Sequence, residues 1–193
     1  MYFARRWFMA VLITVVAIVS VGSKVGAQAQ HVRWDIVSLK AGVARPGGIA
    51  SARANDNSKI TMTGSGTFVA PGGGAGSNGS TKGGGMWTAF NSSGMTAGVG
   101  TYEVTGLVRW EQAPGTFPAI DNIDDGTPSA GLAVLSILYS DGDRGILVVS
   151  CHLLGTPDSV FEGITASKGF VDYWNREGPV PGVDADRTLF HVR

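Results

Sequence analysis

Two apolar runs joined by a short polar turn constrain the fold of this chain more than any other feature. The runs cover residues 131–139 and 146–153, and the turn between them contains Asp141-Gly142. Asp-Gly between apolar runs is a strong hairpin signal, because glycine accepts the positive φ that tight turns require. Both runs are apolar on both faces. The sequence therefore predicts a central hairpin that is covered on either side.

Alternation of apolar and polar residues predicts further strands. Over residues 100–112, Tyr102, Val104 and Trp110 share one face while hydroxyl and charged side chains take the other, which indicates a half-buried antiparallel strand. Other strands are expected at 32–38, 49–54, 60–68, 86–90, 159–166, 169–174 and 187–192. Within 60–68, Gly64 and Gly66 take the place of side chains and indicate a bend or a close neighbour.

These strands predict an all-β fold, a single antiparallel β-barrel or barrel-like β-sandwich of about 8–10 short strands. A barrel is preferred because a closed sheet removes the edges that an exported β-protein must otherwise protect. Glycine supplies 29 of the 193 residues, and eight of these lie in a stretch at 71–85 that is expected to be a flexible loop. Two proline-braced loops, 113–129 and 175–186, are expected where binding sites usually occur.

The N-terminus has the pattern of a secretory signal peptide. Arg5 and Arg6 precede an apolar run over 7–21, and Ala27-Gln28-Ala29 forms a small-residue exit. The run is shorter than the roughly 20 apolar residues of a spanning helix, so cleavage after Ala29 is favoured over a permanent anchor. The paired arginines also resemble a twin-arginine signal, and this alternative to general secretion stays open. The chain is thus divided into a leader, 1–29, and a single domain, 30–193, that is secreted or periplasmic.

The charge of the mature chain limits the classes of partner it can bind, and its cysteine content limits its disulfides. Residues 30–193 hold 12 basic and 15 acidic residues, a formal charge of −3, without a basic cluster. Nucleic acid is therefore not expected as a partner, because phosphate binding needs concentrated positive charge. The only cysteine, Cys151, excludes an internal disulfide and is expected to be a small buried hydrophobe.

Three ionisable residues interrupt apolar faces of the predicted C-terminal strands. His152 shares a face with Val148, Glu162 lies between Val160 and Ile164, and Asp172 lies between Phe170 and Trp174. Burying such groups without partners is costly. If the strands are neighbours, His152, Glu162 and Asp172 would converge in one pocket and perform acid–base chemistry. A structural role for each residue is the competing interpretation. If the sheet encloses a cavity, His191 is a further candidate to line it.

Two other segments are candidate ligand sites. Asp172, Tyr173, Trp174, Asn175 and Arg176 form the densest mixture of aromatic and polar side chains and are predicted to be a binding rim. Asp121, Asp124 and Asp125 are weak candidates for calcium, because their spacing departs from that of a calcium loop and no closing glutamate follows. The common catalytic motifs are absent, and no cofactor is expected.

The leading functional prediction is an exported, non-catalytic β-domain that binds a small molecule, a glycan or a surface protein through its loops and the C-terminal aromatic strand. Two alternatives remain open. One is a small barrel enzyme, an isomerase, cyclase or hydrolase, that uses His152, Glu162 and Asp172. The other is a self-assembling extracellular subunit, in which an edge strand pairs with the next copy.

Overall fold

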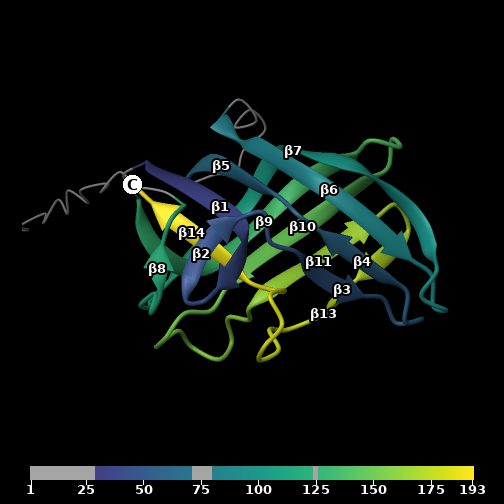
Figure 1. Cartoon of the computed structure of the whole chain (residues 1–193). Helices are drawn as coiled ribbons and strands as arrows, with labels where there is room; N and C mark the ends of the chain where they lie inside the picture. The colour runs from purple at the N-terminus through teal and green to yellow at the C-terminus, as the bar shows by residue number, and fades with distance from the viewer. Residues whose placement is uncertain (1–28, 71–79, 124–125) are drawn as a thin grey trace, which may run out of the picture.

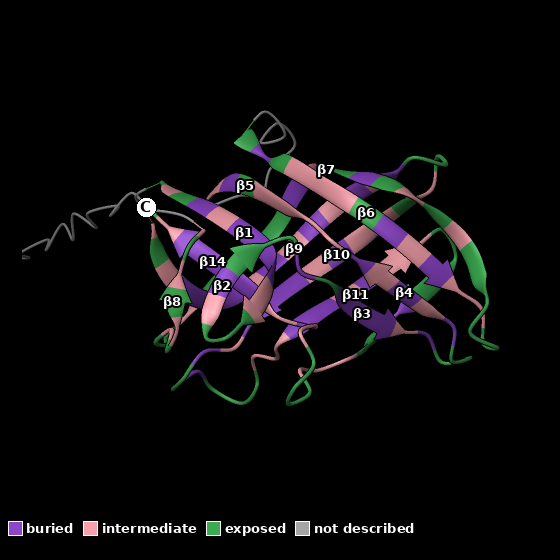
Figure 2. Ribbon diagram, viewed as in Figure 1, coloured by how far each residue is buried: buried purple, intermediate pink, exposed green. Residues whose placement is uncertain are grey.

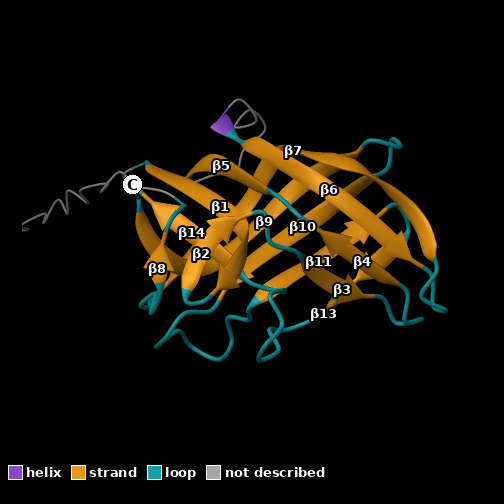
Figure 3. Ribbon diagram, viewed as in Figure 1, coloured by secondary structure: helices purple, strands orange, loops and turns teal. Residues whose placement is uncertain are grey.

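The computed structural model describes residues 29–70, 80–123 and 126–193, and the predicted leader lies outside them except for Ala29. The described residues form strands, turns and loops, with a short 3-10 turn at Ser80 drawn in purple in Figure 3 and no α-helix. None of their segments is a helix with the length and apolar character needed to cross a membrane. The fourteen strands are β1 Gln30–Lys40, β2 Val43–Pro46, β3 Ala50–Arg53, β4 Lys59–Met62, β5 Ser65–Ala70, β6 Lys82–Phe90, β7 Thr96–Ala113, β8 Ile120–Asp121, β9 Thr127–Tyr139, β10 Arg144–Cys151, β11 Gly163–Lys168, β12 Val171–Tyr173, β13 Asn175–Arg176 and β14 Thr188–Val192.

Six strands close into an antiparallel barrel. The order around the barrel is β9, β14, β1, β5, β6 and β7, and β7 pairs with β9 again to complete the ring (Figure 1). Closure satisfies the backbone groups that an open sheet would leave exposed at its edges. The all-β prediction is confirmed, and the architecture is a barrel with additional strands.

Two groups of strands extend the sheet beyond the barrel. β10, β11 and β12 follow from β9, while β4, β3 and β13 follow from β6. The groups approach each other where β11 lies beside β3, so they enclose additional core (Figure 1). A small hairpin of β1 and β2 is joined by β8, which pairs with β2 in parallel.

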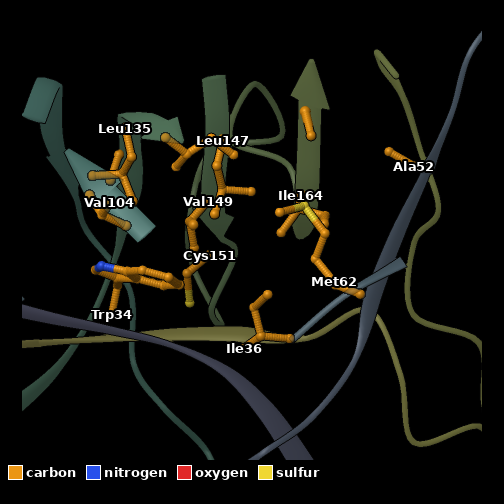
Figure 4. Packing of buried hydrophobic residues seen from close by; sticks show 14 of the residues in the cluster. Trp34, Ile36, Ala52, Met62, Val104, Leu135, Leu147, Val149, Cys151 and Ile164 are labelled. Carbon is orange, nitrogen blue, oxygen red and sulfur yellow. The ribbon is translucent and has the colours of Figure 1, made fainter. Parts of the chain in front are cut away.

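The core lies between these walls, and its largest fully buried side chain is Trp34 (Figures 2 and 4). Glycines make room for that ring, because a Cβ at Gly66 would lie 2.7 Å from Trp34 Nε1. Cys151 is fully buried beside Val149 in this core, as its sequence neighbours predict (Figure 4). Burial raises the pKa of the Cys151 thiol well above its usual range.

The predicted strand over 60–68 is two strands, β4 and β5, with the break at Thr63 and Gly64. A Cβ at Gly64 would lie 2.2 Å from the hydroxyl oxygen of Tyr102, and that hydroxyl donates a 2.8 Å hydrogen bond to the carbonyl oxygen of Thr63. The prediction of a bend or close neighbour is confirmed. The break lets one edge of β6 pair first with β5 and then with β4.

The glycine-rich segment is partly strand. Residues 82–85, predicted as loop, belong to β6, while 71–79 lie outside the described residues. This correction has a steric reason. A Cβ at Gly85 would lie 2.0 Å from the carbonyl oxygen of Thr63, so glycine permits an approach that any side chain would block.

The hairpin of β9 and β10 has the predicted turn, with Leu147 opposite Leu135. β9 joins the barrel to the added strands, because it pairs with β7 and β14 in the barrel and with β10 outside it. Its residues alternate between buried and half-buried, so only one face is covered completely, in contrast to the prediction. The longer loops after β7, after β10 and before β14 gather at one end of the molecule, at the bottom of the view in Figure 3.

Candidate functional site

A cavity of about 350 Å³ opens among these loops. Its wall is mainly apolar and comes from the end of β1, the loop after β7 and the loop after β10. The principal apolar residues are Val37, Leu39, Phe117, Pro118, Leu153 and Leu154. Its polar residues are His152, Glu162, Arg187 and Thr188. The cavity therefore combines an apolar wall with one cluster of ionisable groups.

Glu162 connects two strand ends that do not pair with each other. One carboxyl oxygen accepts a 2.5 Å hydrogen bond from the His152 N–H, and the other accepts a 2.6 Å hydrogen bond from the Thr188 N–H. Surrounding protein removes water from the carboxyl, and this burial raises the pKa of Glu162 to about 7 despite the two donors and the nearby Arg187. Glu162 is thus a structural link whose charge state changes near neutral pH.

His152 is oriented by one well-defined contact. Its Nδ1 lies 2.7 Å from the carbonyl oxygen of Val160. A carbonyl oxygen only accepts hydrogen bonds, so Nδ1 carries the hydrogen and the neutral ring keeps its lone pair on Nε2. The contact holds the imidazole at the cavity and leaves Nε2 as the nitrogen that a ligand can engage.

Arg187 completes the polar cluster. Its Nε is buried without a hydrogen-bond partner among the described residues. Its carbonyl oxygen accepts a 2.9 Å hydrogen bond from the Val37 N–H, which anchors the backbone just before β14. A buried donor without a partner is unusual in native proteins. Arg187 therefore brings a positive charge to the cavity wall, and a ligand would reach its guanidinium at the terminal nitrogens, because Nε is closed off from solvent.

The structure brings together two of the three residues predicted to share a pocket. His152 and Glu162 both line the cavity. Asp172 does not line it; this residue is exposed on β12, where it pairs with Ser167. Ser167 is five residues along the chain from Glu162, a distance of roughly 16 Å in a strand. The expected convergence of all three groups is therefore corrected to a pair.

The predicted binding rim is divided between buried and exposed positions. Tyr173 is buried in the core, whereas Trp174 is 71% exposed. Asn175 donates a 3.1 Å side-chain hydrogen bond to Asn55, and the Arg176 guanidinium lies 5.5 Å from the centre of the Phe161 ring. The rim does not contribute to the cavity wall. Because Trp174 is exposed, stacking of a sugar ring on its indole stays a hypothesis.

Asp121 is engaged with histidine. Its carboxylate lies 2.7 Å from His191 Nε2, and it accepts a hydrogen bond from the Ile123 N–H. Asp124 and Asp125, the other calcium candidates, lie outside the described residues. Within the described ranges, no group of three or more His, Cys, Asp or Glu side chains is placed to hold a metal ion. His191 is buried on β14, away from the cavity wall.

Sequence reasoning missed Arg187 as a site residue. Its position immediately before the apolar segment 188–192 identified it only as the start of a strand. The proline-braced loop that supplies Phe117 and Pro118 was expected to contain a binding site, and that loop does line the cavity. Comparisons of the chain with protein-family models, curated proteins and solved structures give no match.

Proposed function

We propose that this protein binds a small, largely apolar molecule in the cavity at the loop end of the barrel. The observation that carries the proposal is a cavity of about 350 Å³ whose apolar wall meets a single polar cluster. Ligand sites commonly have volumes of about 300–1,000 Å³ and a few polar groups that set orientation. The proposal keeps the predicted binding role and moves it from the aromatic rim to the cavity.

The apolar wall would supply most of the affinity. Burial of apolar surface contributes about 25 cal/mol per Å² removed from water. Leu39 and Phe117 come from segments far apart in the chain and line the same space. A bound molecule would contact both, so it would also stabilise the arrangement of these segments.

Export remains part of the proposal. The predicted leader 1–29 places ligand binding outside the cytoplasm, and N-terminal sequencing of the exported protein tests this. A mature N-terminus at Gln30 is expected. A mature protein that retains Arg5 and Arg6 would contradict the expectation.

A thermal-shift screen of the mature chain tests the binding proposal. Fatty acids, alcohols, terpenoids, aromatic acids and sugars form the panel, and each hit is confirmed by calorimetry. Leu39→Trp is designed to fill the cavity and is expected to abolish the shift produced by a hit. Val108→Trp is the matched control, because Val108 is 50% exposed on β7 and does not line the cavity. Retention of binding in Leu39→Trp, or no binding across the panel, would contradict the proposal.

Acid–base catalysis is a second candidate function. The specific observation in its favour is that Glu162, whose pKa is raised to about 7, lines the same cavity as His152, whose ring is oriented through Nδ1. A group with a pKa near the operating pH transfers protons efficiently. An isomerisation or cyclisation would require only such transfers.

Turnover distinguishes catalysis from binding. A confirmed ligand is incubated with the protein and followed by mass spectrometry and chromatography, which also detects products of unchanged mass. If the cavity is catalytic, His152→Gln should retain ligand affinity within about threefold while conversion falls by about 100-fold or more. A ligand recovered unchanged after prolonged incubation would leave binding as the function.

A further inference from the structure

We infer that the ligand of this cavity is an amphiphilic monocarboxylate whose head group is held by Arg187 and whose apolar body lies against Leu39 and Phe117. The inference rests on the proposed function and names its ligand class. It requires three properties of the cavity: an unused donor, a positive charge that is not cancelled, and an apolar wall next to them.

The unused donors are the terminal nitrogens of the Arg187 guanidinium. They are not among the buried atoms, and no hydrogen bond or ion pair within 4.0 Å to another described residue occupies them. A guanidinium presents its donors in a planar fork that matches the two oxygens of a carboxylate. A carboxylate bound to the terminal nitrogens would occupy these donors and neutralise the charge in one contact.

The charges around the cavity favour an anion. Glu162 is the only acidic residue of the wall, and Arg187 and His152 are its basic residues. Burial raises the pKa of Glu162 to about 7, so at mildly acidic pH this carboxyl is largely neutral and does not cancel the charge of Arg187. Cys151, the other titratable group whose charge interacts with Glu162, is a buried thiol whose pKa is raised. The polar cluster is then net positive.

The remaining wall favours an apolar body attached to that head group. Leu39, Phe117 and Leu153 line the same cavity as Arg187. A sugar would leave many hydroxyl groups without partners against this wall, whereas an alkyl or terpenoid chain requires none. A single guanidinium also suits one carboxylate better than a phosphate cluster of several charges. These features together select a monocarboxylate with a hydrocarbon body.

Matched head groups test the inference. Octanoate, octanol and octylamine are titrated into the mature chain by isothermal calorimetry at pH 6. Octanoate is expected to bind about tenfold or more tightly than octanol, and octylamine more weakly than either. Arg187→Gln should remove the advantage of octanoate and leave octanol binding within about threefold. Arg109→Gln is the control, because Arg109 is an exposed arginine of β7 outside the cavity wall and its loss should change neither affinity.

The possible failures are distinguishable. Equal affinity for octanoate and octanol, or an unchanged preference in Arg187→Gln, overturns the inference and leaves binding of apolar ligands intact. If none of the three probes binds and the wider panel is also negative, the proposed function itself fails. Circular dichroism establishes whether Arg187→Gln is folded. If it is not, the head-group series on the unmodified protein decides, and octylamine binding as tightly as octanoate overturns the inference.

Discussion

The two ends of β11 hold ionisable side chains that the protein treats in opposite ways. Lys168, at the last residue of the strand, lies beside the carboxylates of Asp141 and Asp143 and over the rings of Trp87 and Tyr139. Glu162, just before the first residue, accepts hydrogen bonds from backbone N–H groups and has no ion pair within 4.0 Å in the described part of the chain. One charge has several charged and aromatic partners, and the other has hydrogen bonds without a close opposite charge.

The pKa shifts show what this difference means. Burial alone would lower the pKa of Lys168, but the two carboxylates outweigh it and the pKa is raised. For Glu162, burial outweighs the hydrogen bonds and Arg187, and the pKa is raised to about 7. Lys168 therefore stays charged, whereas Glu162 changes its charge near neutrality. A permanent charge stabilises the turn of the β9–β10 hairpin, and a variable charge lies at the cavity.

Glu162→Ala is expected to have the largest effect on stability. It removes the acceptor of two backbone N–H groups, and each unsatisfied buried donor costs about 1–3 kcal/mol. At pH 5 we expect the free energy of unfolding to fall by about 3 kcal/mol. Urea denaturation followed by tryptophan fluorescence measures the change. A loss below about 1 kcal/mol would mean that water replaces the carboxyl and that the Glu162 link is dispensable.

The free energy of unfolding should depend on pH in the range where Glu162 titrates. Its pKa is higher in the folded state, about 7, than its ordinary value of 4.5, so the folded protein binds more protons between these values. The contribution of Glu162 to stability is therefore complete below pH 4.5 and is lost as pH rises through 7, by up to about 3 kcal/mol. Glu162→Gln should remove this contribution from the pH profile. An identical profile in Glu162→Gln would show that another group titrates in this range.

Lys168→Met should destabilise the protein less than Glu162→Ala. It removes a cation that is only 12% exposed, its ion pairs and its contacts with two rings, but it leaves carboxylates that reach solvent. We expect a loss of about 1–2 kcal/mol, independent of pH between 5 and 8. Thermal melts at several pH values check both statements. A pH-dependent loss in this range would erase the distinction between the two ends of β11.

Asp141→Asn should have the smallest effect. The Lys168 ammonium lowers the pKa of Asp141, so its contribution is present above the ordinary value of 3.8 and is lost as pH falls below it. Asp141 is exposed to solvent and Asp143 still pairs with Lys168, so the expected loss at pH 7 is below about 1 kcal/mol. Chemical denaturation at low and high salt measures it, and a larger loss would show that the two carboxylates act as one unit.

Local pattern predicted most of the fold. The hairpin turn at Asp141-Gly142 needs only its own residues, and Cys151 is surrounded by apolar neighbours on its own strand. β2, β8 and β13 escaped prediction because these strands of two to four residues carry too little periodicity and form by pairing with distant segments. The composition of residues 82–85 is typical of a loop. They belong to β6 because neighbouring backbones approach their glycines so closely that only glycine fits there.

The residues of the candidate site were also predicted only in part from the sequence. His152 and Glu162 could be identified from sequence because each places an ionisable group on an apolar face. Asp172 satisfied the same criterion, yet strand pairing placed it beside Ser167 and outside the cavity wall. Arg187 gave no signal, because the absence of a partner for its Nε is a property of the surroundings and not of the residue.

The sequence by itself determined that the chain is all-β, where its central hairpin turns and which residues are costly to bury, because these properties depend on residues close together in the chain. Only the tertiary structure decided that the sheet closes into a barrel, that Glu162 links β10 to β14 and that Arg187 lines the cavity. These outcomes depend on which strands become neighbours. The backbone hydrogen bonds that join strands are the same whatever side chains the strands carry. The choice of neighbouring strands is therefore made by side-chain packing over the whole molecule.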